Sequence, residues 1–306
     1  MDKMDMILIQ LLLQNSRRPY RELADTLNLS VNAVHKRIQE LIKSGILRTF
    51  TAKINLSAFE KAVSVWVWGR SEAKSLDEII TKLGKDSSTY WVTVASGNIL
   101  YLGANLQDIS KLDSYLAFVK KEGQIPDPTV AIIYSPVHAP SSLTSKRILS
   151  SLDYRIIYSL HKNSRKRITE VSEEIGVSAK TIQRRLSRMV DESLIELSME
   201  FFPDVSNDLF TIFHLNLKAS ADRSKVSPLL INKYSPNVVY PISCSNLPNL
   251  FLCVVWTNTM KELQDIRQCF ENEGIFVSVE LNVSYTGYIF DTWRDEVLQK
   301  KGSPPK

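Results

Sequence analysis

Apolar residues recur at helical spacing in three short segments at the start of the chain. The first spans residues 5–13, and a polar break separates it from a second segment that begins near Pro19. Proline is tolerated in the first turn of a helix. A third segment follows a tight turn, with Ser30 placed as its N-cap and Gly45 placed to end it. The pattern predicts three helices, followed by a short hairpin over residues 46–54, where apolar and polar residues alternate.

The same pattern returns later in the chain at a constant offset of 148 residues. Asn15-Ser16-Arg17 aligns with Asn163-Ser164-Arg165, and the alignment needs no gap from Asp5 to Leu47. Chance matching rarely keeps polar identities and an apolar period in the same register. The chain is therefore predicted to contain two copies of one unit.

Three short helices, a tight turn before the third and a hairpin after it are typical of a winged helix-turn-helix. In that arrangement the third helix enters the major groove of DNA, where Asn, Lys, Arg, Ser and Thr side chains donate to base edges and phosphates. Residues 1–55 hold nine Lys and Arg against five Asp and Glu, and residues 146–190 hold eleven against four. This local excess predicts binding to double-stranded DNA. The second wing is acidic, which favours weaker contact by that copy; its carboxylates are Asp191, Glu192, Glu196 and Glu200.

The remainder of each copy alternates between strand and helix patterns. In the first copy we predict strands at 62–70, 90–96, 99–104 and 129–135 and helices at 75–85 and 108–121. In the first of these strands, Trp66 and Trp68 point away from the face that packs on the helices. Exposed aromatic area of that size marks an interface. Because the second copy places Ile212, His214 and Asn216 on the same face, we expect the two sheets of one chain to pair face to face. Pairing between two chains, as a homodimer, is the alternative.

These boundaries divide the chain into six expected segments. They are a winged helix-turn-helix at 1–55, an α+β domain at 56–135, a linker at 136–151, a second winged helix-turn-helix at 152–204, a second α+β domain at 205–290, and a C-terminal tail at 291–306. The linker is inferred from its prolines and serines, which favour exposed, irregular chain. The end of the tail is expected to be disordered.

The helical motifs resemble the N-terminal domain of Lrp/AsnC-type transcriptional regulators. The shared positions are Asp5, Ile9, Leu13, Asn15-Ser16-Arg17, Glu22-Leu23-Ala24, Leu29-Ser30, Val34, Arg37-Ile38, Leu41 and Gly45-Ile46. The match is specific over the first copy and weaker over residues 152–196. The resemblance implies an α+β fold, in which each winged helix-turn-helix precedes a ferredoxin-like βαββαβ domain for effector binding and oligomerisation. Family members usually carry one such unit per chain, so the duplication is a departure.

The resemblance also implies which side chains lie on the recognition helices. In the first copy they are Ser30, Asn32, Ala33, Lys36 and Arg37, and we add Arg17 and Arg18 from the preceding turn. By the internal alignment, the counterparts on the second recognition helix are Ser178, Lys180, Thr181, Arg184 and Arg185, and we add Arg188 from the same helix. All are expected to contact DNA, against the plainer interpretation that they form a solvated helix face.

Family members often bind a small-molecule effector near a turn that pairs glycine with an acidic residue. The matching turn here contains Gly97 and Asn98, and the carboxylate that would hold an ammonium group is missing. An ordinary β-turn is the better interpretation. A small-molecule effector stays an expectation without a named ligand.

Several classes of protein are disfavoured by what the sequence lacks. Its three cysteines are odd in number and form no C-x-x-C motif, which argues against a disulfide framework. No two histidines fall at metal-ligand spacing and no hydrolase or phosphate-loop motif occurs, so no cofactor, metal or enzyme activity is expected. No apolar run reaches the length of a membrane span, and no signal peptide opens the chain. A cytoplasmic regulator that makes no contact with membranes is expected.

Two alternatives remain at the level of sequence. Sirohaem decarboxylases resemble Lrp/AsnC proteins in both domains, but the stretches that would carry their His-Asn-Tyr-type motif, at 88–91 and 237–240, contain no histidine, and Tyr90 is the only partial match. The second alternative is a protein-interaction scaffold whose helix-turn-helix units no longer bind DNA. The acidic second wing is its main support.

Overall fold

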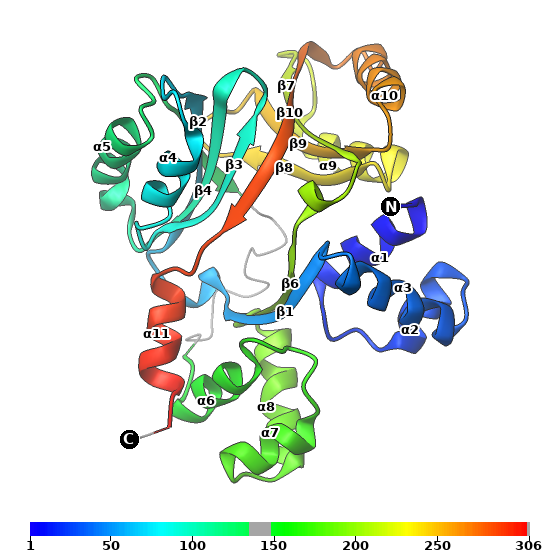
Figure 1. Cartoon of the computed structure of the whole chain (residues 1–306), viewed down its shortest axis with the longest axis vertical. Helices are drawn as coiled ribbons and strands as arrows, with labels where there is room; N and C mark the ends of the chain where they lie inside the picture. The colour runs from blue at the N-terminus through cyan, green and yellow to red at the C-terminus, as the bar shows by residue number, and fades with distance from the viewer. Residues whose placement is uncertain (135–147, 305–306) are drawn as a thin grey trace. The chain divides into compact units, whose positions relative to one another are not determined.

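The computed structural model describes residues 1–134 and 148–304, so most of the predicted linker lies outside the described residues (Figure 1). The chain divides into two compact units, and each unit combines segments from both copies of the repeat. The barrel unit comprises Met1–Met6, Val63–Pro136 and Pro203–Phe290. The helix-turn-helix unit comprises Ile7–Ala62, Val137–Phe202 and Asp291–Lys306. The two α+β segments therefore lie in one unit and the two helix-turn-helix segments in the other.

Each copy contributes three helices and one strand to the helix-turn-helix unit. The first copy provides α1 (Lys3–Gln14), α2 (Tyr20–Leu27), α3 (Val31–Lys43) and β1 (Leu47–Ile54). The second provides α6 (Ser151–Leu160), α7 (Ile168–Ile175), α8 (Ala179–Asp191) and β6 (Ile195–Phe201). The three helices predicted from apolar spacing are thus present in both copies.

Local hydrogen bonds build the turn before each third helix. The Ser30 Oγ accepts the Ala33 N–H at 3.1 Å, and the Ser178 Oγ accepts the Thr181 N–H at 3.3 Å. The second helices end in left-handed residues, Asn28 with φ 53° in one copy and its counterpart glycine with φ 73° in the other. Glycine and asparagine adopt that conformation most readily. The two copies therefore form the same turn with either residue type that suits it.

The wing is not the hairpin expected over residues 46–54. β1 is a single strand, and its antiparallel partner is β6 of the other copy. Phe50 pairs with Met199 and Thr51 pairs with Ser198. In the repeat, Phe50 is equivalent to Ser198 and Thr51 to Met199, so the two pairs are equivalent to one another. The hairpin prediction was wrong because alternation identifies a half-buried strand without identifying its partner.

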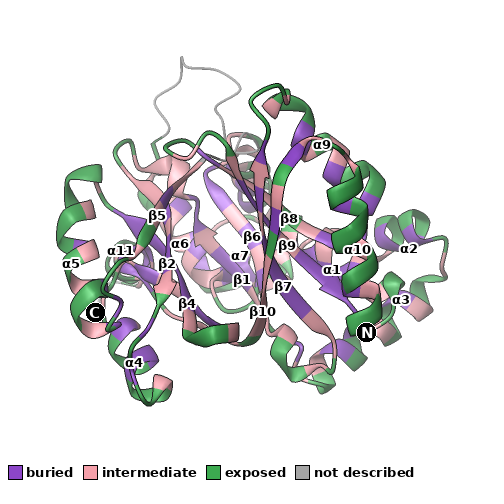
Figure 2. Ribbon diagram, turned by 90° about the horizontal axis from the view of Figure 1, so that it is seen from above, coloured by how far each residue is buried: buried purple, intermediate pink, exposed green. Residues whose placement is uncertain are grey.

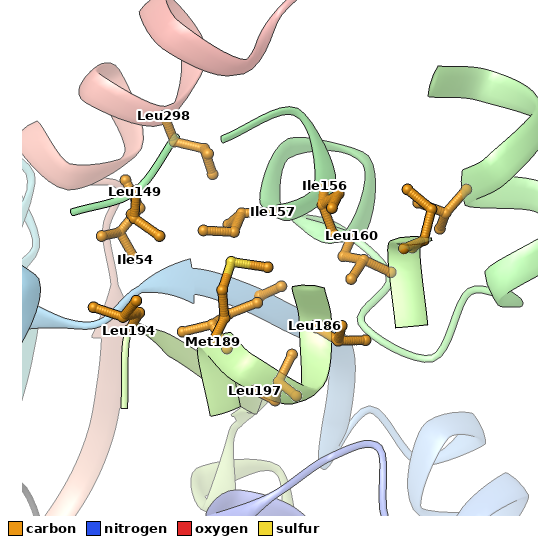
Figure 3. Close-up of a cluster of buried hydrophobic side chains, with 14 of the residues drawn as sticks. Ile54, Leu149, Ile156, Ile157, Leu160, Leu186, Met189, Leu194, Leu197 and Leu298 are labelled. Atoms are coloured by element: carbon orange, nitrogen blue, oxygen red, sulfur yellow. The ribbon is translucent and has the colours of Figure 1, made fainter. Parts of the chain in front are cut away.

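A helix, α11 (Trp293–Gly302), occupies the region expected to be a tail. Thr292 and Asp295 form a capping box at its start, and Leu298 is buried in the hydrophobic core of the second helix-turn-helix (Figure 3). The tail prediction was wrong because charged residues dominate this segment and obscure its short apolar stripe. Residues 305–306 lie outside the described chain.

The barrel unit contains two ferredoxin-like halves. The first consists of β2 (Val63–Arg70), α4 (Leu76–Leu83), β3 (Thr89–Ala95), β4 (Ile99–Leu106), α5 (Leu112–Glu122) and β5 (Thr129–Tyr134). The second consists of β7 (Leu209–Leu217), α9 (Arg223–Tyr234), β8 (Val238–Cys244), β9 (Leu250–Thr257), α10 (Met260–Asn272) and β10 (Phe276–Ile289). This is the βαββαβ order that the resemblance implied, twice.

The two four-stranded sheets join into one closed barrel. Its order is β10-β3-β4-β2-β5-β8-β9-β7, so the last strand of each half pairs with the second strand of the other. The β10–β3 junction includes Ser284 opposite Ala95, and the β5–β8 junction includes Ile133 opposite Cys244. Closure satisfies the strand edges that an isolated half would expose.

Each strand of the barrel divides its side chains between two hydrophobic regions. Val65 and Val67 of β2 are buried with α4 and α5, whereas Trp68 lies in the cluster that fills the barrel interior. Ile212 of β7 belongs to the same interior cluster. Seen from above, the strands are largely buried while the outer surfaces of α5 and α10 are exposed (Figure 2). Within the described residues, no helix combines the length and apolarity needed to cross a membrane.

Candidate nucleic-acid interface

The N-terminal turns of α3 present polar side chains to solvent. Lys36 is the most accessible cation there: its Nζ lies 3.9 Å from the Glu40 Oε1, with the two side chains 79% and 63% exposed. Such an exposed pair contributes little energy, so it leaves the ammonium group available to a phosphate. Of the other predicted contacts, Ser30 and Asn32 are exposed, and Ala33 and Arg37 are half-buried.

The corresponding turns of α8 are more cationic. Lys180 and Arg184 are exposed, as is the capping Ser178, and Thr181 is half-buried. Arg184 and Lys180 lie one helical turn apart, so the two exposed cations share one face of α8.

Two other arginines of α8 are held by a buried carboxylate. The Asp153 side chain is fully buried, and it accepts hydrogen bonds from the Arg185 Nη1 at 3.1 Å and the Arg188 Nη2 at 2.7 Å. Burial alone would raise the pKa of Asp153, but hydrogen bonds from Ser150 and the nearby guanidinium groups lower it overall. Arg188 also pairs with Glu192 at 3.3 Å. Arg185 and Arg188, both predicted to contact DNA, are therefore tied to the interior of their own domain.

The repeated Asn-Ser-Arg turns contact one another across the helix-turn-helix unit. The Ser16 and Ser164 hydroxyls lie 2.6 Å apart. The Arg17 Nη1 donates to the Ser164 and Lys166 carbonyls, the latter at 2.9 Å. Arg165 returns the contact by donating to the Ser16 and Arg18 carbonyls at 2.6 and 3.1 Å. We call these two turns, residues 15–18 and 163–166, the polar crosspiece.

The crosspiece gives Arg17 a different place from the one predicted. Its Nη1 donates to two carbonyls of the other copy, so the crosspiece fixes the orientation of this guanidinium group. Burial, followed by the charge of Arg165, lowers the pKa of Arg17, although a guanidinium of such high ordinary pKa stays charged. Arg18 is half-buried, and its Nη2 donates to the Gln14 Oε1 at 3.3 Å.

The four predicted interface residues lie in or beside the interior of the barrel. Trp68 and Ile212 share its buried cluster, and Trp66 packs against that cluster. The Asn282 side chain donates to the Tyr101 hydroxyl at 2.8 Å, and this hydroxyl shares a hydrogen bond of 2.7 Å with the His214 Nε2. Burial lowers the pKa of His214 to about 4, which agrees with a neutral imidazole at this contact.

The predicted effector turn is a short connection between β3 and β4. Gly97 has φ 71° and Asn98 has φ 58°, so both adopt the left-handed conformation that tight turns require. The second-copy counterpart of Asn98 is Asn246, whose side chain bonds the backbone of β5 at the Val130 and Ile132 positions. In the second copy this position therefore supports the barrel junction.

Three residues make contacts that the sequence did not predict. The roles of Arg165, Asp153 and Asn246 all depend on partners in distant segments, to which single-sequence periodicity is blind. One signal did exist: Asn-Ser-Arg is the longest identical run shared by the two aligned helix-turn-helix segments. An identity retained in both copies suits a contact made between the copies.

These features define a duplicated winged helix-turn-helix protein, and comparisons with known proteins specify its family. The model of the AsnC-type helix-turn-helix domain matches residues 1–42, and that of a winged helix-turn-helix DNA-binding domain matches residues 149–196. The HTH-type transcriptional regulator LysM of Sulfurisphaera tokodaii is 32% identical over 114 residues, which are 36% of this chain and 80% of that protein. The chain belongs to the Lrp/AsnC-type family of transcriptional regulators.

Two other relatives also match less than half of this chain. The regulator FL11 of Pyrococcus abyssi is 25% identical over 127 residues, which are 41% of this chain and 82% of that protein. An HTH-type transcriptional regulator of Pyrococcus horikoshii is 30% identical over 97 residues, or 32% of this chain and 66% of that protein. This last alignment spans just under two thirds of the relative.

The whole duplicated arrangement also occurs among solved structures. The crystal structure of the sirohaem decarboxylase NirDL aligns with a TM-score of 0.61 at 11% identity, covering 98% of this chain and 99% of that chain. This likeness shows the fold alone. The Tyr90 hydroxyl, the one partial match to the decarboxylase motif, accepts a hydrogen bond from the Trp66 Nε1 at 3.0 Å.

Proposed function

We propose that this protein is a sequence-specific DNA-binding regulator of transcription that works by binding and not by catalysis. The observation that carries the proposal is the pair of capped third helices, α3 and α8, with exposed Lys36, Lys180 and Arg184 on their leading turns. Polar side chains there would read base edges, and the cations would neutralise phosphates.

The crosspiece supports simultaneous use of both helices. Because hydrogen bonds and the β1–β6 pairing connect the two copies within one unit, the spacing between α3 and α8 is set by the fold of a single chain. In related dimeric proteins two half-sites are read by two chains. Here one chain would present both recognition helices.

The two helices differ in sequence and in what holds their arginines, so the preferred site is expected to be asymmetric. Arg185 and Arg188 are bound to Asp153, which leaves Lys180 and Arg184 as the principal cations of the second copy. The acidic second wing reduces its attraction to phosphate further. We expect α3 to supply more of the specificity and α8 to supply mainly phosphate contacts.

The closed barrel supports a self-sufficient single chain. Each half already has its partner sheet, and all eight barrel strands have two neighbours within the described residues. Static light scattering at micromolar concentration is expected to give the mass of one chain, 34.8 kDa. A strictly dimeric mass would contradict this part of the proposal and favour the homodimer. A small-molecule effector stays a prediction.

The experiment is a fluorescence anisotropy titration on random and genomic DNA fragments at two salt concentrations. Lys36→Ala and Arg184→Ala are each expected to weaken binding and to reduce the salt slope by about 1. The matched control is Lys121→Ala, which removes an equally exposed lysine (side chain 83% exposed) from α5 in the barrel unit.

The pattern of losses separates specific from general contacts. Loss of discrimination between fragments in Lys36→Ala, with a uniform loss in Arg184→Ala, is the expected result. Equal behaviour of all three variants, or no binding by the unaltered chain at low salt, would reject the DNA-binding proposal and leave the interaction scaffold as the interpretation to test.

A further inference from the structure

A histidine and two carboxylates meet where α11 begins. His161 caps the C-terminus of α6, while Asp291 and Asp295 lie just before and within the first turn of α11. One potential ligand atom from each lies within 4.8 Å of the others. The group belongs wholly to the helix-turn-helix unit and has no part in the DNA-binding proposal above.

The imidazole of His161 is oriented as a metal ligand would be. Its Nδ1 lies 3.0 Å from the Ala52 carbonyl, and because a carbonyl only accepts, this nitrogen carries a hydrogen. The Nε2 then faces the Asp295 Oδ1 at 3.6 Å. In a neutral imidazole this nitrogen is a lone pair aimed at a carboxylate, an arrangement that calls for a cation between them. A ring nitrogen donating to a backbone carbonyl is the usual outer-shell support of a metal-bound histidine.

Hydrogen bonds hold one carboxylate oxygen of Asp295 and leave the other directed at His161. Its Oδ2 accepts the Thr292 N–H at 2.7 Å and the Thr292 hydroxyl at 3.1 Å. Its Oδ1 is buried and accepts no hydrogen bond among the described residues, and the side chain is only 9% exposed. A cation already faces this oxygen: the Lys53 Nζ lies 3.4 Å away. A buried carboxylate oxygen with an incomplete set of donors is a strong attractor for positive charge.

We propose that His161, Asp291 and Asp295 bind one divalent transition-metal ion of the zinc class. One imidazole nitrogen with two carboxylate oxygens suits such an ion, and water would complete four-coordination. Ligand atoms about 2.1 Å from a tetrahedral ion lie about 3.4 Å from one another, close to the 3.6 Å between His161 and Asp295. Asp291 is exposed, so its side chain has room to turn toward the ion.

Lys53 is the competitor for this ion. It supplies the positive charge to Asp295 when no metal is bound, and its ammonium group must move aside when metal enters. The ion would then connect α6 to α11 at the β1 side of the second helix-turn-helix. The first copy has Leu13 at the position of His161, so the duplication provides only one such site.

The test is titration of the full-length chain with Co²⁺ at pH 7.5, followed by visible absorption, with Zn²⁺ used to displace it. One equivalent of Co²⁺ is expected to bind with the intense visible bands of a four-coordinate ion. His161→Gln and Asp291→Asn are each expected to weaken the affinity at least tenfold, and Lys53→Met is expected to strengthen it. His35→Gln, which removes an exposed histidine of α3, is the matched control and should leave the affinity unchanged.

Three results would overturn the proposal. One is no Co²⁺ spectrum in the unaltered chain at a hundredfold excess of metal. Another is undiminished affinity in both His161→Gln and Asp291→Asn, because the exposed Asp291 can be altered without loss of the fold. The third is weaker metal binding by Lys53→Met than by the unaltered chain. Any of these would leave His161 and Asp295 as an ordinary side-chain contact within this unit.

Discussion

The two copies of this repeat are joined in two chemically different ways. In the barrel unit, strand pairing closes a sheet around an interior of aromatic and aliphatic side chains that includes Trp68 and Ile212. In the helix-turn-helix unit, the β1–β6 pair is supplemented by the polar crosspiece, in which Arg17 and Arg165 each bond the backbone of the opposite turn. One duplication has thus produced an apolar junction and a second junction in which polar turns supplement strand pairing and the burial of Ala52 and Ile54 in the core of the second copy.

The difference shows how geometry selects the chemistry of a junction. Two sheets present broad complementary surfaces, so burying aromatic side chains between them yields a large hydrophobic contribution. Two tight turns present little apolar area and several carbonyl groups without partners. Arginine side chains that donate to those carbonyls can join the turns instead, because charge-assisted hydrogen bonds are stronger than neutral ones.

Truncation of the barrel interior should have the largest effect on stability. Trp68→Ala removes a side chain that is 8% exposed and is expected to lower the free energy of unfolding by about 3–5 kcal/mol. Chemical denaturation followed by far-UV circular dichroism measures this. Trp66, half-buried at the edge of the same cluster, supplies the comparison, and Trp66→Ala should cost less. An equal or larger loss in Trp66→Ala would show that burial of Trp68 in the interior is not the main source of the barrel's stability.

Acidification should weaken the barrel junction through His214. Its pKa falls from the ordinary 6.5 to about 4 on folding, so the unfolded chain binds the extra proton between these values and stability falls as pH drops through that window. At pH values below both pKa values the loss of stability reaches about 3.5 kcal/mol, since each unit of pKa difference corresponds to about 1.4 kcal/mol. Above pH 6.5 the contribution of His214 is constant.

The measurement compares the free energy of unfolding at pH 7.0 and 5.0 in variant and unaltered chains. His214→Gln keeps an acceptor for the Tyr101 hydroxyl but does not titrate, so its stability should depend less on pH in this range. The matched variant His35→Gln, altered on the exposed face of α3, should keep the full dependence. Identical slopes for His214→Gln and the unaltered chain would exclude His214 as the source.

The crosspiece should lose less stability than the barrel interior when either arginine is removed. Arg17→Ala and Arg165→Ala each remove two charge-assisted hydrogen bonds to carbonyls, and each is expected to cost about 1.5–3 kcal/mol. Arg165→Ala should cost more than Arg17→Ala, since the Arg165 guanidinium also lies over two aromatic rings. Arg18→Ala is the control, because its side chain donates to Gln14 in its own copy. A loss in either variant no larger than that in Arg18→Ala would show that its hydrogen bonds do not hold the two copies together.

The apolar junction could be predicted from the sequence and the polar one could not. Alternation along β2 separated Val65 and Val67 from Trp66 and Trp68, and a tryptophan on a face without helices has few other uses. Arg17, by contrast, fits phosphate contact and carbonyl contact equally well, because the same donors serve both. The β1–β6 pairing and the position of α11 depend on the partner segment, and no local pattern encodes a partner. The duplication does indicate that the two copies contact one another. The Asn-Ser-Arg run that they share lies at one of these contacts.

The smallest effect, at the centre of the crosspiece, distinguishes a bonding contact from a merely close one. The Ser16 and Ser164 hydroxyls are both buried and lie 2.6 Å apart. Ser16→Ala or Ser164→Ala alone leaves the remaining hydroxyl without this partner, which is expected to cost about 1–2 kcal/mol. Replacing both with alanine removes donor and acceptor together, so the double variant should be no less stable than either single one. The double-mutant cycle would then give a coupling energy of at least about 1–2 kcal/mol. Simple addition of the two single losses would mean that the hydroxyls do not bond one another, and the arginines and β1–β6 would then hold the two copies together without them.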